Sequence, residues 1–174
     1  MFDSTAKLLI TQEINKICGK LEKTNLIQQF LNDKKSNISQ AVIEPDSASR
    51  YIPLKGTDYT LKVVGRANAL VFDKFSESKS PIVMQVKNRA KKLLNQIPSY
   101  ELIQVYVYMW LYKSKRCFFR ERYASSHQST EVNMCSFHDI EEKLQDFGNS
   151  VVEAIQNTEI NKKLEICGSM ICTE

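Results

Sequence analysis

The sequence predicts an α/β domain in which a mixed central β-sheet is flanked by helices. Three observations indicate this class. Amphipathic helical patterns open and close the chain, runs rich in β-branched and apolar residues alternate with polar turns, and an aromatic and apolar helix divides those runs into two groups. The order of helix, strands, helix, strands and helix is typical of a sheet that carries helices on its faces.

The composition is that of an ordinary globular protein. The chain has 174 residues, of which 43% are hydrophobic and 25% are charged, and this suits one compact domain. Its apolar runs are shorter than the ~18 residues of a membrane span, and the opening "MFDSTAKLLITQEINK" lacks a cleavable apolar core. We therefore predict a single intracellular domain over residues 1–174, in the cytoplasm or nucleus, with no membrane partner.

The opening of the chain is predicted to be helical. Asp3 and Ser4 are candidate caps, and apolar residues recur behind them at helical spacing: Leu9, Ile10, Ile14, Ile17 and Leu21. A second short helix is expected around Leu26 to Leu31. The prolines, serines and glycine that follow predict a loop-rich, mobile connection over about residues 32–58.

Two pairs of strands and two further helices are expected after this connection. The run from Tyr59 to Phe72 and the segment "SPIVMQVKN" predict two antiparallel strands. Pro98 precedes a helix from about Tyr100 to Lys113, and "RCFFRERYASSHQSTEVNMCSF" predicts a hairpin. A closing helix carries one apolar stripe, made of Ile140, Leu144, Phe147, Val151 and Ile155. The segment after about residue 158 is expected to be a tail.

The cysteines and basic residues limit the chemistry. The cysteines, Cys18, Cys117, Cys135, Cys167 and Cys172, are scattered without a CxxC pair, which predicts reduced thiols and no zinc site. The net charge of +4 is modest, but basic residues gather in "VKNRAKK" and "YKSKRCFFRER", and such clusters attract phosphate. For either cluster alone, solvated surface charge is the simpler explanation.

Strand alternation groups three polar residues. Successive side chains in a strand point to opposite faces, so Asn68 and Asp73 lie on different faces and Asp73 cannot replace Asn68. In the next strand Gln85 and Lys87 share the face opposite the apolar Ile82, Met84 and Val86. A hairpin therefore brings Asn68, Gln85 and Lys87 within reach of one another. The alternative is that Lys87 is an ordinary polar residue on the solvent face of a sheet.

The following helix adds a polar stripe. Glu101, Gln104 and Tyr108 stand three and four residues apart in "SYELIQVYVYMWLYK", so they share one side of a helix that is otherwise aromatic and apolar. The alternative is a half-buried helix whose polar residues reach out to water at its edges.

Together these motifs resemble the PD-(D/E)XK nuclease superfamily, particularly its RecB-like exonuclease branch, from about residue 60 to residue 113. The family's G-x-x-D strand is matched by "GRAN", with Asn68 in place of the acid. Its E-x-K strand is matched by "QVK", with Gln85 and Lys87, and its Q-x-x-x-Y helix is matched in full by Gln104 and Tyr108. The resemblance implies a restriction-endonuclease-like core.

The resemblance also implies a metal site and a partner. The family's acids hold Mg²⁺ or Mn²⁺, which orients and ionises the attacking water, and Glu13 resembles its upstream acidic position. With Asn68 and Gln85 as neutral amides, metal binding is expected to be weak or lost and cleavage impaired, whereas acids at positions 68 and 85 would make a metal-dependent nuclease. DNA is the expected partner, with RNA as an alternative, and the phosphate contacts are assigned to Arg66, Arg89, Lys91 and Lys92.

A second class of function stays open. The same scaffold can serve as a non-catalytic structural module that binds a protein partner, because a fold alone does not assign a function. A steep fall of DNA affinity with salt would favour nucleic-acid binding, and indifference to DNA together with a protein partner would favour the scaffold.

Overall fold

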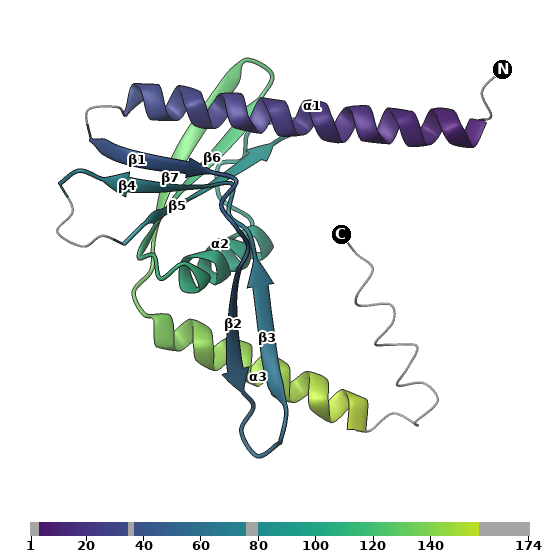
Figure 1. Ribbon diagram of the computed structural model, residues 1–174, viewed down its shortest axis with the longest axis vertical. Helices are drawn as coiled ribbons and strands as arrows, with labels where there is room; N and C mark the ends of the chain where they lie inside the picture. The colour runs from purple at the N-terminus through teal and green to yellow at the C-terminus, as the bar shows by residue number, and fades with distance from the viewer. Residues whose placement is uncertain (1–3, 35–36, 76–79, 157–174) are drawn as a thin grey trace. The chain divides into compact units, whose positions relative to one another are not determined.

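The computed structural model describes residues 4–34, 37–75 and 80–156, with side chains from residue 19 onward (Figure 1). Contacts divide the chain into two compact units. The first comprises Met1–Ser49 and Val64–Cys135, and the second comprises Arg50–Val63 and Ser136–Glu174. The prediction of a single domain is not tested by this division. The expected tail after about residue 158 lies outside the described residues.

The first unit is built on a five-stranded mixed sheet with the order β1-β4-β5-β6-β7. Its strands are β1 (Ile38–Ile43), β4 (Ala69–Asp73), β5 (Ile82–Asn88), β6 (Arg116–Tyr123) and β7 (Ser126–Asn133). Only β5 and β6 pair in parallel; the other described pairs in this sheet are antiparallel. The predicted α/β class with a mixed central sheet is confirmed.

Helix α1 (Ser4–Asp33) covers one face of this sheet. Leu26, Ile27 and Phe30 pack against the β5 residues that the sequence assigns to an apolar face, namely Ile82, Met84 and Val86. The sequence predicts two helices here, and that prediction is wrong. No proline interrupts residues 4–33 and Gly19 is tolerated within the helix, so one continuous helix forms.

Helix α2 (Ser99–Leu111) belongs to the same unit and contacts β5 and β6. It begins directly after Pro98, as predicted, and buries Val105 and Met109 completely. Proline suits this place because the first helical turn has no use for its missing N–H. Apolar packing thus anchors α2, and its polar residues lie at the border of the packed surface.

Two sequence predictions about strands are corrected. Residues 32–58, expected to be loop-rich, contain β1 and also β2 (Ala48–Pro53), whose exposure alternates along the strand. The single strand expected from Tyr59 to Phe72 is broken at residues 66–68 into β3 (Thr60–Gly65) and β4, which pair in different sheets. The prolines and serines of residues 32–58 favoured a loop over the alternating strand β2. The apolar residues on both sides of residues 66–68 favoured one continuous strand over β3 and β4.

The second unit consists of the β2–β3 pair and α3 (Phe137–Gln156). A Cβ atom on Gly148 would lie 2.6 Å from Leu54 Cδ2, so glycine lets α3 approach this strand pair closely. Gln145 Nε2 also donates a hydrogen bond to Pro53 O at 2.7 Å. Helix α3 packs through Gly148, whereas Phe147, predicted as part of the apolar stripe, is 61% exposed. No helix among the described residues is long and apolar enough to span a membrane.

Candidate functional site

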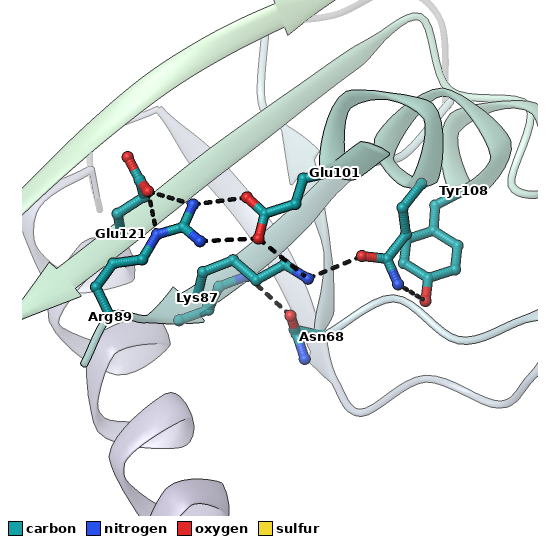
Figure 2. Close-up of polar contacts among 8 residues, drawn as sticks. Asn68, Lys87, Arg89, Glu101, Tyr108 and Glu121 are labelled. Atoms are coloured by element: carbon teal, nitrogen blue, oxygen red, sulfur yellow. Dashed lines mark hydrogen bonds and ion pairs between the residues drawn. The ribbon is translucent and has the colours of Figure 1, made fainter. Parts of the chain in front are cut away.

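The centre of the candidate site is a chain of hydrogen bonds from β5 to α2. Lys87 Nζ donates to Gln104 Oε1 at 2.8 Å, and Gln104 Nε2 donates to the Tyr108 hydroxyl at 3.0 Å (Figure 2). The Lys87 side chain is 26% exposed, so its amine is partly removed from water. The structure therefore brings together three residues that the sequence assigned to one site.

Asn68 adjoins this chain of hydrogen bonds from the residue before β4. Its Oδ1 accepts the Val86 N–H at 2.8 Å (Figure 2), and Val86 lies between Gln85 and Lys87 in β5. The pairing of β4 with β5 begins at Ala69↔Met84. Just beyond this last backbone pair, the Asn68 side chain supplies the hydrogen-bond acceptor for the Val86 N–H. Asn68 thus has a structural role besides any role in binding.

Gln85 lies on the α2 side of β5, next to Lys87 in strand alternation. It is only 5% exposed, and its Oε1 has no hydrogen-bond partner among the described residues. A buried acceptor without a partner costs about 1–3 kcal/mol. The polar side chain at position 85 is therefore not explained by the stability of the fold.

Gly65, the glycine of the "GRAN" motif, makes room for α2. A Cβ atom at this position would lie 2.7 Å from Tyr108 Cε1 and 2.9 Å from Leu111 Cδ1. Any larger residue must displace the tyrosine that ends the hydrogen-bond chain. The glycine is thus required by the packing of Tyr108, and the position of Tyr108 in turn fixes Gln104.

A second cluster lies beside the first. Arg89 follows β5 and donates two hydrogen bonds to Glu101, from Nη1 to Oε1 at 2.8 Å and from Nη2 to Oε2 at 2.6 Å. It also pairs with Glu121 of β6 (Figure 2). Glu121 in turn accepts a hydrogen bond from Gln128. Glu101 and Glu121 are 5% and 1% exposed. The hydrogen bond to Glu101, followed by that to Glu121, raises the pKa of Arg89.

This pairing bears on the role that the sequence assigned to Arg89. The Arg89 side chain is 13% exposed and pairs with two carboxylates, so its charge is compensated within the protein, and the phosphate contact assigned to it stays a prediction. Arg66, Lys91 and Lys92 are exposed in the structure, so they stay available for the contacts predicted for them.

The sequence reasoning missed Lys23 and Glu121. Burial lowers the pKa of Lys87, Glu101 at 3.9 Å raises it, and the charges of Lys23 and Arg89 lower it further. Lys23 of α1 therefore stands near enough to add positive potential. Nothing in the sequence indicates that Lys23 lies near Lys87, because α1 and β5 are far apart along the chain. Glu121 had a signal, since it shares a strand face with Cys117 and Phe119, which are fully buried.

The described residues do not fit a divalent metal ion. No group of three or more histidine, cysteine or acidic side chains among residues 19–34, 37–75 and 80–156 could hold one. Asn68 offers a neutral oxygen already used by Val86, Gln85 offers another neutral oxygen, and Lys87 would repel the ion. Glu13, the third predicted ligand, has its side chain outside the described residues.

Comparison with known proteins supports the fold. No family model and no curated protein matches this chain. A solved structure described as "Crystal structure of SSO0001" is similar, with a TM-score of 0.55 and 21% sequence identity over 82% of this chain. The match covers 65% of that chain, so the present chain spans less than two thirds of its length. At this identity the likeness shows the α/β fold alone.

Proposed function

We propose that this chain is a nuclease-fold protein that binds DNA through its phosphates and, with amides at positions 68 and 85, does not cleave it. The observation that carries the proposal is the Lys87 amine, which is held by Gln104 in a partly buried position where Lys23 adds positive potential. The resemblance to PD-(D/E)XK nucleases in the motifs around these residues supports the same function.

The electrostatics favour a phosphate at Lys87. Arg89 already engages both oxygens of Glu101, and Lys87 lies 3.9 Å from that carboxylate, beyond hydrogen-bond range. The positive charge of Lys87 is therefore only partly compensated within the protein. Burial lowers its pKa, which means that placing the cation here is unfavourable for the free protein. An incoming phosphate would supply the missing counter-charge, and the partly desolvated setting would strengthen that contact.

The chemistry of cleavage needs groups that this chain lacks at the two motif positions. Hydrolysis in this superfamily requires Mg²⁺ or Mn²⁺ to ionise water and to offset charge on the phosphate. Carboxylates at 68 and 85 would create a negatively charged pocket beside Lys87, whereas the amides leave the site positive. A metal-dependent nuclease, either an exonuclease or an endonuclease, is therefore the function we assign to the acid-bearing form only.

The test is a salt titration of binding to fluorescently labelled single-stranded DNA, duplex DNA and RNA in EDTA. The logarithm of affinity should fall linearly with the logarithm of salt concentration, and Lys87→Met should weaken binding and reduce the slope by about one. Lys74→Met is the matched control, because Lys74 is exposed, lies outside both basic clusters and follows β4 at the Ile82 end of β5, away from Lys87. A flat salt dependence for all three nucleic acids would overturn the proposal and favour the protein-binding scaffold.

A further inference from the structure

Helix α2 exposes an apolar stripe beside the Lys87 site. Tyr100 is 71% exposed and Ile103 is 63% exposed, which places both among the most exposed large hydrophobic residues described. Val107, one turn after Ile103, is half-buried on the same side. Large apolar side chains that gather on one surface often mark a binding site. We call Tyr100, Ile103 and Val107 the Tyr100 stripe.

The stripe adjoins the residue that holds Lys87. Tyr100 and Gln104 are four positions apart, so their Cβ atoms are about 5–6 Å from each other on the helix surface. Helical side chains lean toward the N-terminus, and the Gln104 amide therefore lies over the turn that begins near Tyr100. Since Gln104 Oε1 accepts the Lys87 hydrogen bond at 2.8 Å, a ligand on Lys87 would find Tyr100 as a neighbour.

The surrounding charge identifies the kind of ligand. Lys91 and Lys92 are exposed on the segment that leads from β5 into α2, and Gln104, four residues after Tyr100, holds the Lys87 amine. An exposed aromatic ring on the helix that holds a lysine amine suits a polyanion that carries flat apolar groups. Single-stranded nucleic acids have this chemistry, and their bases stack on aromatic side chains while cations follow the backbone.

We propose that Tyr100 stacks on an unpaired nucleobase of the strand whose phosphate binds at Lys87, with Ile103 completing the apolar surface under that nucleotide. The inference rests on the proposed function. Inside a duplex both faces of each base are already stacked, so this contact is available to an unpaired nucleotide and not to an internal base pair. Tyr100 thus gives the site a preference for single-stranded segments or unpaired ends over intact duplex, a preference that Lys87 alone cannot supply.

The experiment compares four proteins on three ligands by fluorescence anisotropy in EDTA. The proteins are the unchanged chain, Tyr100→Ala, Tyr100→Phe and the control Tyr51→Ala, since Tyr51 is 63% exposed on β2 in the second unit. The ligands are a single-stranded oligonucleotide, the same length of abasic strand, and a duplex. Tyr100→Ala should weaken binding of the single strand by about 5- to 150-fold, the range of one lost base stack. Tyr100→Phe and Tyr51→Ala should bind it as the unchanged chain does.

The abasic strand separates stacking from phosphate binding. It keeps every phosphate but has no base, so Tyr100→Ala and the unchanged chain should bind it equally. Equal binding of the normal single strand by these two proteins, with salt-dependent binding intact, would overturn the Tyr100 inference and leave the proposed function standing. No binding to any ligand would overturn both. A dimer in sedimentation that Ile103→Glu dissociates would assign the stripe to a second copy of the chain and also overturn the inference.

Discussion

Arg89→Met should strongly destabilise the protein. Methionine keeps the length and apolar stem of the side chain but removes the charge between Glu101 and Glu121. These carboxylates are 5% and 1% exposed, so water cannot replace the lost partner. The variant would leave two buried negative charges with little compensation, which is among the few mechanisms that give large effects from one substitution.

The size of the effect follows from burial and from the remaining partners. Breaking a buried ion pair by removing one member costs about 3–5 kcal/mol. Lys87 Nζ, 3.9 Å from Glu101, and Gln128, which donates to Glu121, offset part of this cost. We therefore expect the free energy of unfolding to fall by about 3 kcal/mol, a large share of the ~5–15 kcal/mol that is typical of a domain.

Urea denaturation followed by the fluorescence of Trp110 measures this loss, because Trp110 is the single tryptophan and is 1% exposed. Arg116→Met is the matched control. Arg116 pairs with Glu131 and Asp73, but its side chain is 39% exposed, and surface pairs are worth about 0–1 kcal/mol. Equal effects of Arg89→Met and Arg116→Met would refute the reasoning. Changing Glu101 and Glu121 to glutamine in the Arg89→Met background should restore part of the stability, because it removes both uncompensated charges.

Four further predictions test the site. Gly65→Ala should displace Tyr108 and weaken DNA binding more than it lowers stability, since a Cβ atom would lie 2.7 Å from the Tyr108 ring; anisotropy and urea denaturation measure the two effects. Burial lowers the pKa of Lys87 from 10.5, so Lys87 should lose its charge at a pH below 10.5. DNA affinity should therefore fall in one step as the pH rises through that value, and Lys87→Met should lack this step. Burial raises the pKa of Cys117 to about 12, so iodoacetamide should label the exposed Cys135 and spare Cys117 in the folded protein, as peptide mass spectrometry would show. Asn68→Asp with Gln85→Glu should lower the melting temperature in EDTA, and Mn²⁺ should raise it and bring cleavage that Lys87→Met abolishes; cleavage that survives Lys87→Met, or strong cleavage by the unchanged chain, would contradict this.

Local periodicity carried the correct sequence predictions. The alternation of Ile82, Met84 and Val86 identified the apolar face of β5, and α1 packs on that face. The four-residue spacing of Gln104 and Tyr108 placed them on one side of a helix, and they are hydrogen-bonded at 3.0 Å. Both inferences need only the repeat of a single element.

Pairings between distant elements were beyond the sequence. Arg89 looked like a surface cation because its partner Glu121 is 32 residues away and belongs to a strand that pairs in parallel with β5. Lys23 had no local signal for the same reason. The break between β3 and β4 was also hidden, because each half has the composition of a strand and only the sheet partners distinguish them.

The two amides of the motif differ in what they contribute to the fold, and this difference bears on the function. Asn68 is explained by structure alone, because its Oδ1 satisfies the Val86 N–H at the end of the strand ladder. Gln85 is not, since its Oε1 is buried without a described partner and its paired neighbour Phe119 on β6 is fully buried and apolar. An apolar residue of similar size would avoid the cost of the unpaired oxygen. Position 85 is therefore a place where the fold alone gives no reason for a polar atom, and it stands next to the lysine for which we propose a phosphate ligand.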